Sequence, residues 1–210
     1  MPGDARIIIA GAGRMGGLID RILTAAGFET TMIDYSSKRL DIMAQFGVKN
    51  YYGDATRPDL LAAAGIAGAD IFIVAIDGRD NITKVVEYAT QTFPKLHVIA
   101  RAVDRDHVYD LWNAGCRDII RETYDSSLRM GRSAFEAMGI RRDTADRMVA
   151  TFNTRDQELM LVVSEVHQPG VPPHENPAYV ARVLELREQR GADLVAEITA
   201  IRDRAAQTGT

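Results

Sequence analysis

Short apolar runs alternate with longer amphipathic segments from Ala5 to about Ile120. The apolar runs are residues 6–10, 30–34, 48–52, 70–75, 97–100 and 117–120. They are nearly continuously apolar, which is typical of strands buried on both faces of a parallel sheet. The segments between them, at 14–26, 37–46, 57–64, 79–92 and 105–113, have the length of helices. This alternation predicts an α/β fold, a doubly wound parallel sheet with helices on both faces.

The pattern changes after Thr123. Residues 126–166 contain no proline, and apolar residues such as Met148, Phe152 and Leu159 recur at helical spacing. We expect this long amphipathic stretch to pack on a second subunit, because a lone helical arm cannot bury its apolar face. The proline-rich segment 168–173 ends the stretch. A last helix is predicted over about 177–205, interrupted at Gly191.

Composition and charge narrow the class of protein. The 210 residues are 46% hydrophobic and 26% charged, which is the balance of a soluble globular protein. The net charge of −4 argues against a nucleic-acid partner. The single cysteine, Cys116, excludes an internal disulfide. The chain carries Asp4 and Arg6 near its start and has no apolar run long enough to span a bilayer, so we expect a soluble, cytoplasmic chain.

A glycine-rich loop directly follows the first predicted strand and opens the first predicted helix. It reads Gly11-Ala12-Gly13-Arg14-Met15-Gly16. Gly11 permits a tight turn, Gly13 lets backbone amides approach a diphosphate, and Gly16 lets the helix pack closely on the sheet. The phosphate would lie at the helix N-terminus, where unpaired N–H groups favour an anion.

Asp34 ends the second predicted strand, eighteen residues after Gly16. A carboxylate at this place accepts hydrogen bonds from both hydroxyls of an adenosine ribose and repels a 2′-phosphate. The loop and Asp34 therefore predict a site for an adenine nucleotide without a 2′-phosphate. The alternative is that the glycines only tighten a turn and that Asp34 is a solvated strand end.

Catalytic groups are not recognisable beside this site. None of the histidines His97, His107, His167 and His174 forms a convincing catalytic pair with a Lys, Tyr or Ser, and no cluster has metal-ligand spacing. A small NAD-dependent oxidoreductase therefore rests on the glycine loop and Asp34 alone. We predict that the chain is not an enzyme and that the nucleotide is an effector or a structural ligand.

Longer motifs carry a more specific resemblance. They are IIIAGAGRMG (7–16), MIDYS (32–36), FGVKNYYGDATRPDLLAAAGI (46–66), IVAIDG (73–78), FPKLHVIARAVDRDH (93–107) and RETYDSSLRMGRSAFEAMG (121–139). Over about residues 6–160 the chain resembles the cytoplasmic regulatory domain of the glutathione-gated potassium efflux systems, the Kef family. That domain is of the RCK or TrkA-N type, which regulates potassium transport through a nucleotide-binding Rossmann fold.

The resemblance implies two ligands, NADH or AMP in the Rossmann cleft and glutathione or its adducts at a homodimer interface. The nucleotide residues that it implies, together with the glycine loop, are Gly11, Ala12, Gly13, Arg14, Met15, Gly16, Asp34, Tyr35, Asp54, Ala55, Thr56, Ala75, Ile76, Asp77 and Arg101. The glutathione residues are Arg14, Phe46, Arg121 and Asn153. Phe46 resembles the aromatic that a bulky sulfur substituent displaces, and Arg101 resembles a phosphate-facing or interface arginine. Tyr124 stands where family members often carry Phe.

The resemblance also implies partners and an organisation into three parts. These are a nucleotide-binding Rossmann domain over 1–122, a helical dimerisation and ligand-interface arm over 123–166, and a proline-rich break with a C-terminal helix over 167–210. A potassium-transporting membrane domain, in the same or a partner chain, is the expected target, so the domain would act at the cytoplasmic face of the cell membrane. A flavodoxin-like ancillary subunit is a further possible partner. A TrkA-like subunit of a potassium uptake system is the alternative.

Overall fold

A computed structural model describes residues 6–45 and 47–207 of the chain. These residues form two compact units, which divide between Glu122 and Thr123. Phe46 lies outside the described residues, so its predicted role in ligand binding has no structural counterpart here.

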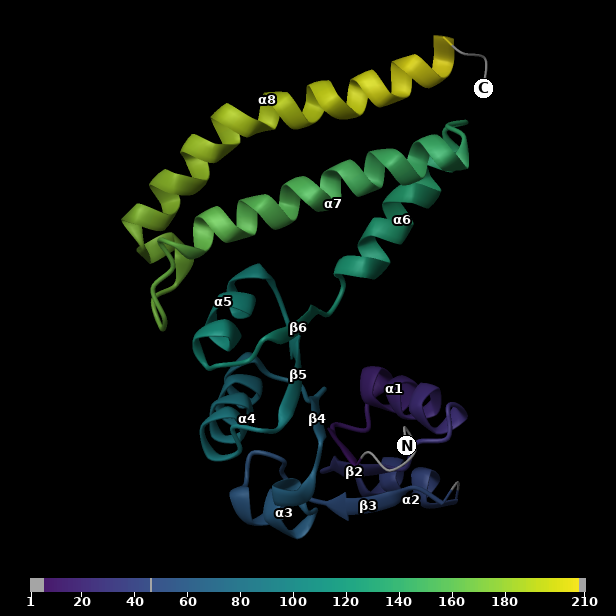
Figure 1. Cartoon of the computed structure of the whole chain (residues 1–210), viewed down its shortest axis with the longest axis vertical. Coiled ribbons are helices and arrows are strands. Elements are labelled where there is room, and N and C mark those ends of the chain that lie inside the picture. Colours follow the sequence, from purple (N-terminus) through teal and green to yellow (C-terminus); the bar gives the residue numbers. More distant parts are fainter. Residues whose placement is uncertain (1–5, 46, 208–210) are drawn as a thin grey trace. The chain divides into compact units, whose positions relative to one another are not determined.

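The described part of the first unit contains a sheet of six parallel strands (Figure 1). They are β1 (Ile7–Ala10), β2 (Thr30–Asp34), β3 (Lys49–Tyr52), β4 (Ile71–Val74), β5 (His97–Ala102) and β6 (Asp118–Arg121). The strand order is β3-β2-β1-β4-β5-β6, with every neighbouring pair parallel. This order confirms the predicted doubly wound fold of the Rossmann type.

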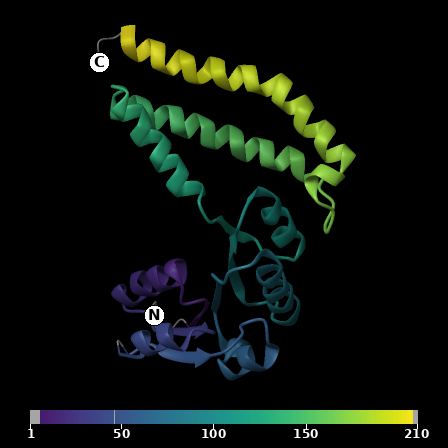
Figure 2. The ribbon, with the colours of Figure 1, turned by 180° about the vertical axis from the view of Figure 1, so that it is seen from behind.

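Helices cover both faces of this sheet, as the views in Figures 1 and 2 agree. They are α1 (Arg14–Ala25), α2 (Ser37–Gln45), α3 (Pro58–Ala63), the 3₁₀ turn η2 (Ile66–Gly68), α4 (Arg79–Thr92) and α5 (Arg105–Asn113). Alternate residues of β1 supply the two cores. Ile7 and Ile9 pack with Leu40 of α2, whereas Ile8 and Ala10 belong to the core that the apolar residues of α4 and α5 complete. Near-continuous apolar strands are therefore required, because both faces are buried.

The second unit consists of α6 (Tyr124–Ala137), α7 (Arg142–Ser164), the 3₁₀ turn η3 (Pro173–Glu175) and α8 (Pro177–Gln207). The expected continuous helical stretch over 126–166 is wrong, because the chain turns between α6 and α7. Gly139 has φ +86° there, and its neighbour Ile140 donates its backbone N–H to the Phe135 carbonyl oxygen over 3.1 Å. This is a Schellman ending, which only a glycine enters without strain.

The long helices α7 and α8 lie side by side in both views (Figures 1 and 2). Val163 of α7 and Leu186 of α8 are buried in this unit. The predicted interruption at Gly191 is wrong, since α8 continues through it. Part of the apolar surface of α7 is thus covered within the chain, while the second subunit stays a prediction.

Candidate functional site

A cavity of about 530 Å³ lies at the carboxyl ends of β2, β3 and β4. Seven of the predicted nucleotide residues line it: Asp34, Tyr35, Asp54, Ala55, Thr56, Ile76 and Asp77. Because β1 and β4 are neighbours, the strand order reverses between them, and open α/β sheets bind ligands at such a switch point. The topology therefore brings three segments that are far apart in the sequence to one place.

The glycine loop closes this end of the sheet through very close backbone contacts. Gly11 has φ +101°, and a Cβ on it would lie 2.7 Å from the carbonyl oxygen of Ala75. A Cβ on Gly16 would lie 1.8 Å from the carbonyl oxygen of Gly11. By contrast, a Cβ on Gly13 would meet no atom within 4 Å. Two of the glycines are therefore fixed by packing, and the third faces open space where a ligand can approach the backbone.

Helix α1 begins within this loop, directly after Gly13, with Arg14 and Met15 in its first turn. Gly13 is its N-cap residue and supplies no side-chain hydrogen bond, and the first turn carries no acidic residue. The first backbone N–H groups of an α-helix have no partners within the helix. The start of α1 therefore favours an anion, as the sequence predicts for the phosphate.

Asp34 is buried and holds the glycine loop. Its Oδ2 accepts a hydrogen bond of 2.7 Å from the backbone N–H of Ala12, and its Oδ1 accepts one of 2.7 Å from that of Ser36. Arg39 places Nη1 3.4 Å from both oxygens. The carboxylate thus lines the cavity and also fixes the neighbouring backbone, a structural role that the sequence pattern does not predict.

The segment Gly53–Thr56 forms another wall of the cavity. The Gly53 N–H donates to the Asp34 carbonyl oxygen over 3.0 Å, and Asp54 Oδ1 accepts from the Thr56 N–H over 2.8 Å. Hydrogen bonds from the backbone and side chain of Thr56 hold the pKa of the Asp54 carboxyl below its ordinary value. This wall therefore presents an ionised carboxylate.

Arg101 on β5 contacts residues that line the cavity but does not line it itself. Its Nη1 donates to Asp77 Oδ1 over 2.9 Å and to the Ile76 carbonyl oxygen over 3.3 Å. Its Nη2 donates to Glu122 Oε2 over 2.6 Å. The predicted phosphate-facing or interface arginine thus lies between two carboxylates in this structure.

Asn81 at the start of α4 and Gly78 before it also line the cavity, although neither is among the predicted site residues. Gly78 is the last residue of the IVAIDG motif (73–78), of which only Ala75, Ile76 and Asp77 were predicted to bind the nucleotide. Asn81 belongs to no such motif, and only the sheet topology places the start of α4 at this edge. Arg39 was missed because its pairing with Asp34 depends on the first turn of α2.

The predicted glutathione residues are divided between the two units. Arg14 opens α1 and Arg121 ends β6, both in the first unit, whereas Asn153 lies on α7 in the second. The structure brings Asn153 together with Tyr124, whose hydroxyl donates to Asn153 Oδ1 over 3.0 Å. The departure from the family pattern at Tyr124 thus touches a predicted ligand residue directly.

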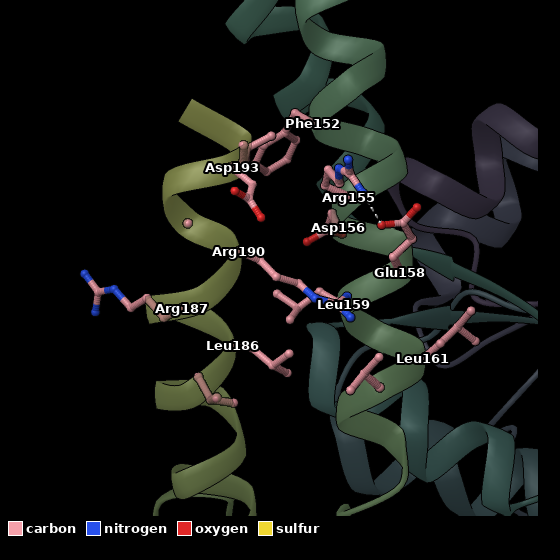
Figure 3. A pocket seen from close by; sticks show the side chains of 14 residues that line it. Phe152, Arg155, Asp156, Glu158, Leu159, Leu161, Leu186, Arg187, Arg190 and Asp193 are labelled. Atoms are coloured by element: carbon pink, nitrogen blue, oxygen red, sulfur yellow. Dashed lines mark hydrogen bonds and ion pairs between the residues drawn. The ribbon is translucent and has the colours of Figure 1, made fainter. Parts of the chain in front are cut away.

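A second cavity, of about 730 Å³, lies between α7 and α8 (Figure 3). Leu159 and Leu186 point into it, and Arg190 extends from α8 toward α7. Gly191 lines it too, and a Cβ there would meet no atom within 4 Å. Beside it Arg155 pairs with Glu158 over 2.9 Å. The sequence predicted the helices but not this groove.

Two further observations concern the described residues only. No group of three or more His, Cys, Asp or Glu side chains among them could hold a metal ion. None of their helices combines the length and apolarity that a membrane crossing requires.

Two family models match the chain. The TrkA-N domain matches residues 7–122, and the C-terminal domain of the potassium efflux system KefB matches residues 126–207. Together the two matches extend over the described parts of both units.

Individual relatives agree with these matches. The glutathione-regulated potassium-efflux system protein KefC of Cronobacter sakazakii is 38% identical over 160 residues, and that of Salmonella paratyphi B is 40% identical over 159 residues. These alignments cover 76% and 74% of this chain but 26% of each relative, so the chain spans about a quarter of their length. The structure of the Kef C-terminal domain of Shewanella denitrificans in AMP-bound form is similar with a TM-score of 0.72 and 34% identity, covering 78% of this chain and 99% of that one.

Proposed function

The chain belongs to the family of Kef C-terminal domains, which contain a TrkA-N domain, and from this we propose that it is a ligand-sensing regulatory domain of a potassium efflux system. Its ligands in this proposal are an adenine nucleotide and glutathione or a glutathione adduct. The observation that carries it is the cavity at the switch point of the sheet, which is lined by Asp34, the residue whose carboxylate binds the backbone of the glycine loop.

The residues present fit an adenine nucleotide. A volume of about 530 Å³ falls within the range of small-molecule sites. The open space beside Gly13 and the unpaired N–H groups at the start of α1 suit a phosphate. Asp34 suits the ribose hydroxyls, and the wall around Asp54 suits the adenine. The relative from Shewanella denitrificans is described in an AMP-bound form, which supports AMP, with NADH as the other candidate.

Glutathione is proposed as the regulatory ligand. It carries two carboxylates and one ammonium, which two arginines and an amide side chain can bind, and arginine suits a bidentate carboxylate contact. Arg14, Arg121 and Asn153 are the residues proposed for it, and the KefC relatives are named glutathione-regulated. Phe46 would meet the sulfur substituent of an adduct.

Regulation requires a target outside this chain. The KefC relatives are about four times as long as their aligned segment, and we propose that a potassium-transporting membrane domain, in the same or a partner chain, is the target. The domain would act at the cytoplasmic face of the membrane as a homodimer, with 123–166 as its dimerising arm, 167–210 as a further helical part and a flavodoxin-like protein as a further partner. Glutathione would favour one arrangement of the subunits and its adducts another.

Calorimetry tests the proposal. Titration of the purified chain with AMP and with NADH is expected to show saturable binding of at least one of them, and absence of binding by both contradicts the nucleotide site. Titration with glutathione and with an S-substituted glutathione, combined with sedimentation, tests the second ligand and the dimer. If the chain binds a nucleotide but shows no binding of glutathione at about 1 mM, a metabolite-scale concentration, the result supports the TrkA-like alternative. Substrate-dependent oxidation of bound NADH would favour the oxidoreductase.

A further inference from the structure

Arg101 connects a wall of the nucleotide cavity to the last residue of the first unit. Its guanidinium lies 2.9 Å from Asp77 Oδ1 on one side and 2.6 Å from Glu122 Oε2 on the other. Asp77 lines the cavity, and Glu122 directly precedes Thr123, where the second unit begins. One cation, whose side chain is only 11% exposed, therefore contacts both the ligand site and the exit of the chain toward α6.

Two hydrogen bonds with β5 hold Glu122 at this exit. Its backbone N–H donates to the Ala102 carbonyl oxygen over 2.9 Å, which continues the ladder between β5 and β6. Its carboxylate receives Nη2 of Arg101. The backbone bond does not depend on the cavity, whereas the side-chain bond shares its guanidinium with Asp77. A change at Asp77 therefore reaches Glu122 through Arg101.

The guanidinium has a buried donor that the described contacts do not use. Its Nε is buried and has no hydrogen-bond partner among the described residues. Nε and Nη2 form one edge of the planar fork that binds a carboxylate bidentately, yet Glu122 takes only Nη2. A buried donor without an acceptor costs free energy. A second arrangement, in which Nε also has an acceptor, is therefore favoured when the contact between Arg101 and Asp77 breaks.

Of the two carboxylates, Asp77 is the one whose contact with Arg101 can break. Its side chain is 75% exposed, compared with 26% for Glu122. An adenosine supplies O–H and N–H donors to a carboxylate at the cavity wall, and these compete with Arg101 for Asp77. Solvent reaches the Asp77 carboxylate and weakens its attraction to Arg101, so hydrogen bonds from a bound ligand can compete for this carboxylate.

We propose that Arg101 is a positioning residue that links the nucleotide cavity to the junction before α6. Without a nucleotide, its guanidinium is shared between Asp77 and Glu122. When a nucleotide binds, the guanidinium leaves Asp77 and pairs with Glu122 through two donors, Nε and Nη2. The inference rests on the proposed nucleotide function. Because linkage is reciprocal, strengthening the Arg101–Glu122 pair on binding means that this pair in turn strengthens nucleotide binding.

The first experiment follows the Nε group directly in the wild-type chain. A ¹⁵N NMR spectrum reports the Nε–H signal of Arg101, which is expected to shift on addition of AMP because the proton gains an acceptor. The exchange of this proton with solvent is expected to slow by about fivefold or more. An unchanged signal under saturating AMP overturns the inference. Failure of AMP and NADH to bind at all overturns the proposed function first, so the two failures are distinguishable.

Variants supply the second experiment. Hydrogen exchange of the amides of residues 121–125 is expected to slow about fivefold with AMP in the wild type and to stay unchanged in Glu122→Gln. AMP affinity is expected to fall about fivefold in Glu122→Gln, because the neutral amide cannot accept the two-donor pairing. Glu87→Gln, an exposed carboxylate on α4, is the control and should behave as the wild type. Equal affinities and equal exchange in all three proteins contradict the coupling.

Discussion

The Asp34 carboxylate lies 2.7 Å from the backbone nitrogen of Ala12, so the side chain that ends β2 fixes the loop that follows β1. The two strands are paired in parallel, which brings the residues 22 positions apart in the sequence to the same edge. One side chain therefore serves as both a structural acceptor and the proposed ribose ligand. A substitution that tests the ribose contact must therefore keep the hydrogen bond to the Ala12 N–H.

Asp34→Asn is expected to separate these roles. The Asn amide keeps one oxygen that can accept the Ala12 N–H, but it loses the charge and the second acceptor. AMP affinity should fall by about tenfold or more, since a hydrogen bond to a charged group is worth about 1.5–3 kcal/mol. Calorimetry measures the affinity, and Asp41→Ala, an exposed carboxylate of α2, is the control. Unchanged affinity in Asp34→Asn would remove the residue from the nucleotide site.

Gly16→Ala is expected to destabilise the first unit. The added Cβ would lie 1.8 Å from the carbonyl oxygen of Gly11, which is backbone and cannot rotate away. Overpacking of this kind costs about 1–3 kcal/mol. The neighbouring Gly17 provides a matched control, because a Cβ there meets the flexible end of Met43 at 3.1 Å, and alanine is the better helix former. Urea unfolding that ranks Gly16→Ala at or above Gly17→Ala in stability would contradict this packing argument.

Much of the first unit was predictable from the sequence because its central strands, β1, β2 and β4, are mostly buried and therefore apolar. The six observed strands coincide with the apolar runs to within two residues at each end, and Asp104 caps α5 by accepting the His107 N–H over 2.8 Å. The break after α6 was not predicted, since Gly139 lies inside an otherwise helical pattern and its positive φ depends on the Schellman bonds. Gly191 costs α8 about 1 kcal/mol in helix propensity, but a helix packed along α7 tolerates it.

The candidate site was predictable only in its local parts. The spacing of residues along the chain predicts the glycine loop and Asp34 as parts of a nucleotide site. The resemblance to the Kef family predicts the segment that forms the Gly53–Thr56 wall. The contacts of Arg101 with Asp77 and Glu122 span 24 and 21 residues and depend on which side chains meet at the edge of the sheet. A one-dimensional pattern contains no information on such pairings.

His107 is expected to make the free energy of unfolding depend on pH. It is fully buried, its Nδ1 accepts the Val103 N–H over 3.1 Å, and its Nε2 lies 3.0 Å from the Thr83 hydroxyl. This arrangement favours the neutral ring. Burial, followed by the charge of Arg79, lowers the pKa of His107, against opposing attraction from neighbouring aspartates.

The sign of the effect follows from this lowered pKa. The unfolded chain takes up a proton at about pH 6.5 while the folded chain does not, so folding stability is present above that pH and declines as the pH falls toward the folded pKa. The decline approaches about 1.4 kcal/mol per pH unit. Urea unfolding at about pH 7.5 and about pH 5.5 should show it in the wild type and in His174→Gln, which changes an exposed histidine, but less in His107→Gln. Equal slopes in all three would exclude His107 as the cause.

Cys116 is expected to be unreactive in the folded chain. Its side chain is buried, its Sγ lies 3.3 Å from the carbonyl oxygens of both Val98 and Asp118, and burial raises the pKa of the thiol. Thiolate is the reactive form, so alkylation should be at least about 100-fold slower than in urea. Mass spectrometry of maleimide-treated protein measures this. Rapid modification without unfolding would mean that the thiol itself is available to electrophiles, in place of sensing through bound glutathione.

Tyr124 and Asn153 provide the last prediction. The Tyr124 hydroxyl donates to Asn153 Oδ1 over 3.0 Å. In the proposed glutathione site, the amide N–H₂ of Asn153 would donate to a carboxylate of the ligand. Tyr124→Phe should lower glutathione affinity about threefold through lost orientation, and Asn153→Ala should lower it further, since hydrogen bonds to charged groups are the stronger ones. The double variant should match Asn153→Ala alone, because orienting an absent amide has no effect. Calorimetry on the four proteins measures the coupling, with Tyr52→Phe, an exposed tyrosine of β3, as the control. Additive losses in the double variant would place Tyr124 and Asn153 in separate roles and remove the orienting function of the hydroxyl.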